Sequence, residues 1–358
     1  MKNKILYIYP ESSTFIRKDT GFLSRHYRVI TPVHNWKNKS LVPLNFLRQF
    51  LFLCRNLPGS KAVFVMFGGY WSFLPALAGK VTGIPVYIIP GGTDCVSFPS
   101  LGYGSLRKPL MRTFIRWSFS LCTGLLPVDE SLVISKYSYH PDSDYPMQGY
   151  RFFFPNLKTP YRVINNGFDP EFFNSDPYAK KADSFIAVAP VNSLMRVRVK
   201  GVDTVIMLAR KFSTCSFAIV GLSDEVASRL GPLPANLKIH RFMPQEKFMS
   251  MLAESRYILQ LSISEGFPNA LCEAMLCHCI PVGSAVGPVP SIIGDTGYVI
   301  DSPDPDYLTA RMNEILGTDT DTRHRMGLKA RERIAGLYHI SRREKAFLQL
   351  LEPGATSL

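Results

Sequence analysis

Short apolar segments rich in β-branched residues alternate with helix-like stretches along this 358-residue chain. Such alternation predicts parallel strands joined by helical crossovers, because parallel neighbours need a long connection across one face of the sheet. The pattern starts again after residue 180, and each block has the length of one domain. The expected fold class is therefore α/β, with two Rossmann-like, doubly wound parallel-sheet domains. The expected strands are 5–9, 62–67, 86–90, 124–128, 184–189, 216–220, 237–240, 257–261, 280–283 and 297–300, and the expected helices are 18–26, 72–82, 106–119, 201–212, 245–254, 269–277 and 305–316.

The boundary between the blocks is expected just after the run Asn165 to Pro170, since Asn-Gly marks a turn and Asp-Pro a break. We therefore assign residues 1–172 to a first domain and 173–335 to a second. A helix-like tail at about 336–358 is expected to pack back on the first domain. Ligands of open parallel sheets bind beyond the carboxyl ends of the strands, so a cleft between the two domains is the expected substrate site.

The net charge of +13 is unevenly distributed, because residues 1–175 carry +11 and residues 176–358 carry +2. Within the basic half, segments 36–55 and 106–119 interleave aromatic and aliphatic residues with Lys and Arg. Both are interpreted as amphipathic helices that could lie on an anionic membrane surface. Ordinary helices packed on a sheet are the competing interpretation, and solubility charge without a partner is another. No nucleic-acid partner is expected, because no recognised binding motif accompanies the charge.

Cysteine usage and hydropathy indicate the compartment. The seven scattered cysteines form no even disulfide framework and favour a reducing environment. Cys277-His278-Cys279 lacks the spacing of convergent zinc ligands, so no metal is predicted. No apolar run reaches the ~18–20 residues of a spanning helix, and the apolar stretch at the start is too short for a signal peptide. The expected location is cytoplasmic and peripheral, on the inner face of the cell membrane.

The most informative segment is 262–275, which follows an expected strand and opens an expected helix. Gly266 permits close backbone approach, and Pro268 and Asn269 suit the first positions of a helix. The free N–H groups at such a helix start favour an anion such as a diphosphate. Glu265 would lie in the loop above this site. Glu273, one turn into the helix, is positioned to accept hydrogen bonds from two ribose hydroxyls.

This segment resembles the Glu-x7-Glu signature of the family 4 retaining glycosyltransferases, whose fold is the two-domain GT-B architecture. Its letters are Ser-Glu-Gly-Phe-Pro-Asn-Ala-Leu-Cys-Glu-Ala-Met. Further stretches match the same family in the same order. They are Val163 to Asp169, Lys200 to Asp203, Ile219 to Gly221, Pro281-Val282, Gly287 and Gly297 to Val299. The resemblance covers most of residues 160–300 and is diffuse before them.

The resemblance implies a metal-independent enzyme that uses a nucleotide-sugar as co-substrate and needs no other cofactor. It implies that Glu273 binds the ribose, that Lys200 binds the diphosphate and that Glu265 holds hydroxyls of the transferred sugar. It also implies a front-face displacement in which the leaving phosphate helps to deprotonate the acceptor. The donor-binding residues are then Arg196, Lys200, Gly266, Phe267, Pro268, Asn269, Ala270 and Glu273.

The sequence departs from the family pattern in three places. The phosphate-binding Arg is out of position, so Arg196 or Arg198 must serve, with Arg196 slightly favoured. His278 stands where a small residue is usual, and either narrows the cleft or merely packs. The first domain lacks the family's His, and Asp94 is the polar catalytic candidate there, alongside Glu265. After another expected strand, the residues Gly68, Gly69 and Tyr70 are expected to contact the acceptor.

Together these features predict transfer of a sugar from a UDP- or GDP-type donor to a hydroxyl of a saccharide. The basic first domain predicts an acceptor linked to a lipid such as a polyprenyl diphosphate, as in the synthesis of cell-surface polysaccharides. Two alternatives remain open from the sequence. One is a non-catalytic scaffold of the same fold that binds a saccharide or a partner enzyme. The other is a nucleotide-sugar epimerase on that fold.

Overall fold

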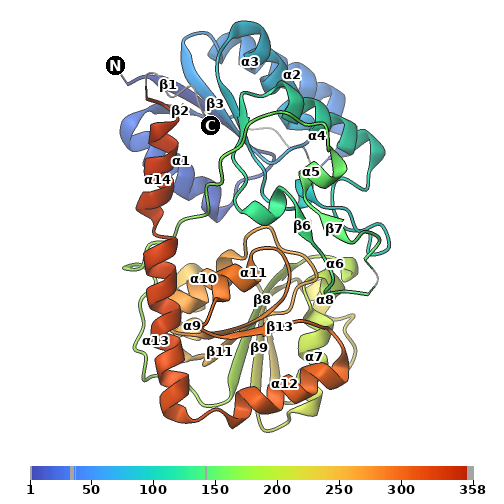
Figure 1. The fold of residues 1–358 in the computed structure, drawn as a ribbon, viewed down its shortest axis with the longest axis vertical. Helices are drawn as coiled ribbons and strands as arrows, with labels where there is room; N and C mark the ends of the chain where they lie inside the picture. The colour runs from blue at the N-terminus through green and yellow to red at the C-terminus, as the bar shows by residue number, and fades with distance from the viewer. Residues whose placement is uncertain (1, 33–35, 37, 142, 353–358) are drawn as a thin grey trace. The chain divides into compact units, whose positions relative to one another are not determined.

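The computed structural model describes residues 2–32, 36, 38–141 and 143–352, and the chain divides into two compact units (Figure 1). Unit 1 comprises Met1–Lys136, Asp144–Asn166 and Ile340–Leu358, and unit 2 comprises Tyr137–Ser143 and Gly167–His339. Each unit is built on a parallel sheet with helical crossovers. The predicted α/β class is therefore confirmed. None of the described helices combines the length and the apolarity needed to cross a bilayer.

Unit 1 holds a five-stranded parallel sheet of order β2-β1-β3-β4-β5. Its central strands are almost entirely buried, as expected where helices cover both faces. A short antiparallel ribbon of β6 and β7 lies outside this sheet. The strands are β1 (Lys4–Ile8), β2 (Arg28–Ile30), β3 (Ser60–Met66), β4 (Val86–Ile89), β5 (Gly124–Leu125), β6 (Ser135–Lys136) and β7 (Met147–Gln148). The helices are α1 (Thr14–His26), α2 (Val42–Asn56), α3 (Tyr70–Thr82), α4 (Pro109–Leu121), α5 (Tyr150–Phe153) and α14 (Ile340–Gln349), with 3-10 turns at Lys39–Leu41, Thr93–Cys95 and Glu130–Leu132.

Unit 2 holds a six-stranded parallel sheet of order β10-β9-β8-β11-β12-β13. Helix α7 packs along β8 and β9, whereas α10, α11 and α13 pack against β11 and β12 (Figure 1). The strands are β8 (Ser184–Val191), β9 (Ser216–Leu222), β10 (Leu237–His240), β11 (Tyr257–Gln260), β12 (Ile280–Ser284) and β13 (Tyr298–Ile300). The helices are α6 (Leu194–Val199), α7 (Val202–Lys211), α8 (Asp224–Ala227), α9 (Gln245–Glu254), α10 (Asn269–Leu276), α11 (Val289–Ile293), α12 (Pro305–Gly317) and α13 (Thr320–Leu337).

Each sheet has one point at which the strand order reverses direction. In unit 1 it lies between β1 and β3, and in unit 2 between β8 and β11. At such a point the two flanking crossovers leave on opposite faces, which opens a crevice beyond the carboxyl ends of the strands. The loops that follow β3, β8 and β11 therefore lie where open parallel sheets bind ligands.

The division between the units differs from the expected 1–172 and 173–335. It falls between Asn166 and Gly167, and residues 137–143 belong to unit 2. The reason lies in α13, whose Arg331 guanidinium donates to the Pro170 and Phe173 carbonyls at 2.8 and 2.5 Å. The Phe168 N–H also donates to the Tyr338 carbonyl. These bonds fix the segment after Gly167 to unit 2.

The chain returns to unit 1 at Ile340, within the tail expected at 336–358; residues 353–358 lie outside the described part. Helix α14 packs on α1. Arg343 forms a buried bidentate ion pair with Asp19, with both N–O distances 2.7 Å, and Tyr7 donates to the same carboxylate. Because a buried charge left without its partner is costly, this pair anchors the tail.

Candidate active site

The reversal point of unit 2 brings a lysine and a glutamate into contact. Lys200 follows β8 and α6, and Glu265 lies in the loop that follows β11. The Lys200 Nζ donates to Glu265 Oε1 at 2.6 Å, and the side chain of Gln260 donates to the same oxygen at 2.9 Å. Gln260 is the last residue of β11 and is buried. A carboxylate held by two side chains at this place is positioned for a ligand.

A glycine brings the two loops together. Gly201 has a φ of +66°, and a Cβ at this position would lie 2.1 Å from the Leu261 carbonyl oxygen. Only glycine fits there without moving the backbone. The Ile263 N–H then donates to the Val199 carbonyl at 2.8 Å. The segment Lys200-Gly201 is therefore fixed against the end of β11.

Helix α10 begins at Asn269, as the sequence predicted, with Pro268 before it. Leu271, Cys272 and the last turn of the helix are buried. Asn269, Ala270 and Glu273 are half-buried and lie on the remaining face, at the spacing of one helical turn. The structure thus places Glu273 and the helix start on a common face. That face combines a carboxylate with the positive end of a helix.

Phe267, Pro268 and Gly266 complete the loop before α10. Phe267 is buried and packs against Phe168 and Tyr338, with ring centroids 6.3 and 5.5 Å away. The Phe267 side chain therefore packs into unit 2 and holds the loop in place. Gly266 is half-buried and Pro268 is buried. Ligand contact from this stretch is expected from its backbone, as the sequence proposed.

The two candidate arginines lie on different faces of α6. The Lys200 N–H donates to the Arg196 carbonyl at 3.0 Å, so Arg196 and Lys200 are one turn apart on the same face. Arg198 is exposed and lines a pocket together with Asp203. The helix geometry therefore places Arg196, rather than Arg198, on the same face as Lys200.

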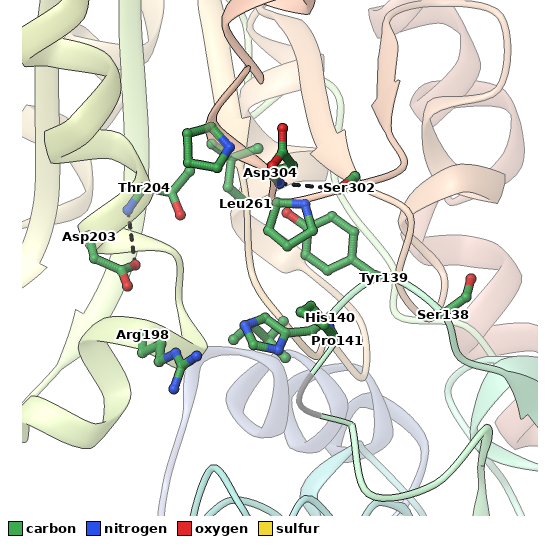
Figure 2. Close-up of a pocket in the computed structure, with 13 residues that line it drawn as sticks. Ser138, Tyr139, His140, Pro141, Arg198, Asp203, Thr204, Leu261, Ser302 and Asp304 are labelled. Atoms are coloured by element: carbon green, nitrogen blue, oxygen red, sulfur yellow. Dashed lines mark hydrogen bonds between the residues drawn. The ribbon is translucent and has the colours of Figure 1, made fainter. Parts of the chain in front are cut away.

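Arg198 belongs to a polar pocket of about 550 Å³ that the sequence did not reveal (Figure 2). Figure 2 shows Arg198 and Asp203 on one side of it, and Tyr139 and Asp304 on the other. Burial raises the pKa of Asp203, and the hydrogen bond from the Thr204 N–H opposes that rise. The lining comes from four separate stretches, 138–141, 198–204, 261–263 and 302–305. No local pattern links these stretches, so only the folded chain shows them.

In unit 1, Asp94 has a different environment from the one expected for a catalytic acid. It is 1% exposed, and its carboxylate accepts the N–H groups of Gly68, Gly91 and Gly92 at 2.8 to 3.1 Å. Burial raises the pKa of Asp94, and these hydrogen bonds oppose the rise. The carboxylate ties the loops after β3 and β4 together. A catalytic role for Asp94 stays a prediction, and the contacts favour a structural one.

The predicted acceptor residues lie at the end of β3. Gly68 and Gly69 are buried, and a Cβ on Gly68 would lie 2.7 Å from the Phe119 ring. Tyr70 is half-buried and packs edge-on against Phe114 of α4, with centroids 5.1 Å apart. Gly68 allows close packing of the loop on α4, and Gly69 makes room for the Trp71 ring of α3. The Gly68 and Gly69 N–H groups donate to Asp94 and Ser72, so contact with the acceptor stays a prediction for this loop.

His278 packs instead of lining a site. It has a φ of +61° after α10, and its Nδ1 lies 3.3 Å from the Ser175 hydroxyl. Burial lowers the pKa of His278 to about 4, and the nearby Arg331 adds to this effect. Cys279 is buried and contacts the Lys180 amine. Within the described residues, no group of three His, Cys, Asp or Glu side chains is arranged to hold a metal ion.

Comparison with known proteins identifies this region. Residues 191–333 match the family model described as glycosyl transferases group 1. The matched stretch contains every donor-binding residue predicted from the sequence. In the curated set, N-acetyl-alpha-D-glucosaminyl L-malate synthase of Bacillus anthracis is 35% identical over 107 residues, 29% of this chain and 27% of that enzyme. O-antigen chain mannosyltransferase B of Escherichia coli is 33% identical over 79 residues, which are 22% of this chain and 21% of that protein.

Similarity to solved structures extends over nearly the whole chain. The Anabaena protein HepE, solved with UDP and glucose, has a TM-score of 0.70 at 14% identity, covering 97% of this chain and 99% of HepE. Sucrose-phosphate synthase from Thermosynechococcus elongatus has a TM-score of 0.73 at 13% identity, covering 98% of both chains. At this identity the likeness concerns the fold alone, and it confirms the predicted GT-B fold.

Proposed function

We propose that this chain, a GT-B protein whose residues 191–333 form a glycosyltransferase group 1 domain, is a retaining glycosyltransferase. It would move a sugar from a UDP- or GDP-type donor to a hydroxyl of a saccharide acceptor. The observation that carries the proposal is the Lys200–Glu265 contact of 2.6 Å. It places a cation and a carboxylate together at the reversal point of the sheet, inside the segment that matches the family.

In this proposal the donor diphosphate binds between Lys200, Arg196 and the N-terminus of α10. Glycosyl transfer builds negative charge on the departing diphosphate, and fixed cations and helix N–H groups stabilise such charge strongly. Glu273, on the same face as the helix start, would accept hydrogen bonds from the ribose hydroxyls. Binding of the diphosphate by these groups would need no metal ion.

Lys200 can exchange its partner when the donor binds. In the structure its amine donates to Glu265, whose Oε1 also accepts from Gln260. A diphosphate would compete for the Lys200 amine. Glu265 would keep its bond from Gln260, and its freed lone pairs would accept hydroxyls of the transferred sugar. The contact between Lys200 and Glu265 thus orients both side chains.

The chemistry we propose is a front-face displacement. Two carboxylates that act as nucleophile and acid must flank the anomeric carbon, and Glu273 cannot do so while it holds the ribose. The leaving phosphate would therefore take the proton of the acceptor hydroxyl. Lys200 and Arg196 would lower the energy of that phosphate as the glycosidic bond breaks.

The names of two matched proteins bear on the substrate class: the Escherichia coli relative is an O-antigen chain mannosyltransferase, and HepE was solved with UDP and glucose. We propose a saccharide acceptor in glycan synthesis, carried on a lipid such as a polyprenyl diphosphate. The acceptor would contact the loop of Gly68, Gly69 and Tyr70. The strongly basic first half supports a peripheral position on the cytoplasmic face of a membrane.

A thermal-shift panel of UDP-, GDP- and ADP-sugars on the purified chain identifies the donor, because at equal concentration the ligand with the lowest Kd stabilises the folded state most. Transfer to a lipid-linked saccharide extract is then measured with that donor. We expect Glu265→Gln and Glu273→Gln to lower transfer at least 100-fold, a magnitude typical of losing one electrostatic contact to the transition state. Glu225→Gln changes an exposed glutamate of unit 2 and is expected to keep full transfer.

Unimpaired transfer by both glutamate variants would refute the assignment. Donor binding without any transfer or hydrolysis would favour the scaffold alternative. Interconversion of two nucleotide-sugars without an acceptor would favour the epimerase. Nuclear magnetic resonance of the anomeric proton in the product decides whether the configuration is retained.

A further inference from the structure

Helix α2 buries two polar side chains and leaves leucines exposed. Asn45 and Gln49 are 0% exposed, and the Gln49 amide donates to the Trp71 carbonyl at 2.8 Å. Leu47 and Leu51 lie on the opposite face and are 56% and 57% exposed. A helix that packs on a sheet normally shows the reverse arrangement. The outward leucines therefore add nothing to the core of unit 1, whereas Leu53 and Phe46 of the same helix pack inward.

The neighbouring helix α3 continues this apolar surface. Val81 of α3 is 78% exposed and Leu77 is also exposed. Between α2 and α3 runs an apolar groove of about 560 Å³. We call the exposed residues Leu44, Leu47, Phe50, Leu51, Leu77 and Val81 the α2–α3 face. The groove is lined by Phe50, Leu53, Cys54, Leu57, Pro58, Leu74, Leu77, Ala78, Val81, Thr82 and Ile84.

Helix α4 contributes less to this surface than the sequence suggested for residues 106–119. Its Phe114 ring packs against Phe46 of α2 and against Tyr70 and Phe73 of α3. Most of its apolar side is therefore used in packing. Leu110 and Trp117 remain exposed. Of the segment 36–55, Lys37 lies outside the described residues.

The stretch of sequence that contains α2 and α3 carries almost only positive charge. From residue 20 to residue 128 the chain holds twelve Lys and Arg and one acidic residue, Asp94. Asp94 is buried, so this part of the described surface presents no carboxylate. Arg48 and Arg55 are exposed and recur at helical spacing with Leu44 and Leu51. Positive charge thus borders the apolar residues of α2.

We propose that the α2–α3 face docks on an anionic lipid bilayer and that its groove takes a hydrocarbon chain of a bilayer lipid. Arginines at the margin of an exposed apolar helix face match anionic headgroups above acyl chains. A groove lined by apolar side chains suits a lipid chain, which offers no hydrogen bonds. The proposal extends the membrane part of the function above and names the surface responsible. Its tests involve no sugar transfer.

The first test is flotation with vesicles of phosphatidylcholine, with and without phosphatidylglycerol. We expect binding to the anionic vesicles at low salt and at least tenfold weaker binding at high salt or to neutral vesicles. Leu47→Ser with Leu51→Ser is expected to lower binding at least tenfold. Leu337→Ser, at an exposed leucine of unit 2, is the matched control and is expected to bind normally. Unchanged thermal unfolding shows that the double variant folds, since both leucines are exposed.

The second test reads the groove directly through Cys54. Cys54 is exposed, and the six other cysteines are buried, so a thiol-reactive bimane dye labels this position selectively. We expect anionic vesicles to shift the bimane emission to the blue, and vesicles with brominated acyl chains to quench it. Trp117, on the exposed side of α4, is expected to be quenched less than the dye.

Three results would overturn the proposal. They are equal binding to neutral vesicles, normal binding by the leucine double variant, and a Cys54 dye that vesicles leave unchanged. Binding of an acidic protein in place of vesicles would also overturn it. Donor binding by thermal shift is measured in the same variants, because it belongs to unit 2. Lost flotation with intact donor binding isolates the α2–α3 face from the proposed transfer chemistry.

Discussion

Asp94 of unit 1 and Glu265 of unit 2 both lie beyond the carboxyl ends of parallel strands, yet their carboxylates have different partners. Asp94 accepts three backbone N–H groups from glycines of its own unit. Glu265 accepts from the side chains of Lys200 and Gln260. The Asp94 carboxylate is bound by backbone groups that are fixed by the fold. The Glu265 carboxylate is bound by side chains that can move.

The difference shows how a buried carboxylate becomes available to a ligand. Backbone N–H groups cannot rotate away, so a ligand gains no access to Asp94 without unfolding its loop. A lysine side chain has several rotatable bonds and can turn to a diphosphate while Glu265 stays in place. The same sheet edge therefore holds a structural clamp in unit 1 and the proposed binding site in unit 2.

The largest effect is expected from Asp94→Ala. The change leaves three buried N–H groups without acceptors, and each unsatisfied donor costs about 1 to 3 kcal/mol. We expect the free energy of unfolding to fall by about 4 kcal/mol, measured by urea denaturation. Asp94→Asn keeps one acceptor oxygen and is expected to recover part of this loss. A fall below about 1 kcal/mol together with lost transfer would make Asp94 catalytic and break the comparison.

The next effect is expected from Lys200→Met. Loss of a cation that faces the leaving diphosphate lowers kcat/KM about 100- to 1,000-fold, or about 3 to 4 kcal/mol of transition-state stabilisation. Unfolding is expected to change much less, because the side chain is only partly buried. Lys211→Met, at an exposed lysine of α7, is the control. Normal transfer by Lys200→Met would show that this pair is structural like Asp94.

The third effect is expected from protonation of His278, which we interpret as a structural residue of unit 2. The pKa of His278 is lowered to about 4 by burial and by Arg331, so the fold holds the neutral ring. The unfolded chain binds the proton near pH 6.5. The neutral His278 ring therefore contributes up to about 3 kcal/mol to the free energy of unfolding above pH 6.5. This contribution is lost as the pH falls toward 4.

Urea denaturation at pH 7 and pH 4.5 measures this loss. His278→Asn removes the titrating ring, and Asn tolerates the left-handed backbone at this position. The variant is expected to lose less stability than the wild type between the two pH values. An identical loss in both proteins would contradict the structural role of His278.

The smallest effect is expected from Gln260→Leu. It removes one of the two hydrogen bonds on Glu265, and a single such bond contributes about 1 kcal/mol. We expect transfer to fall less than tenfold, with unfolding nearly unchanged. A loss as large as that of Lys200→Met would mean that Gln260, rather than Lys200, holds Glu265 in position.

Much of the fold follows from the sequence, because most strands in these sheets are local apolar runs. Every strand expected from the sequence overlaps one in the structure. The edge strand β2, only three residues long and not fully buried, had no such run. Helix α13 was missed because its buried residues, Gly327, Ala330 and Ile334, are small or few among many charges.

The site was predictable only in part. The segment 262–275 predicted Glu265, Glu273 and the start of α10, because its turn and helix signals are local. One partner of Glu265, the side chain of Gln260, was not predicted from the sequence. A polar residue at the end of a buried strand is the signal that could have indicated Gln260. The pocket lined by Tyr139 and Asp304 left no recognisable pattern in the sequence, because its lining residues are far apart along the chain.

The alternation of strands and helices, the start of α10 and the excess of positive charge in the first half all follow from the amino-acid sequence alone. These properties depend on neighbours within a few residues, or on composition alone. Only the tertiary structure decided that Asp94 is bound by glycine N–H groups, that Lys200 meets Glu265 and that α2 turns its leucines outward. Gly91 and Gly92 are close to Asp94 in the sequence, but Gly68 is 26 residues away and Glu265 is 65 residues from Lys200, so these pairs meet only when the sheets form.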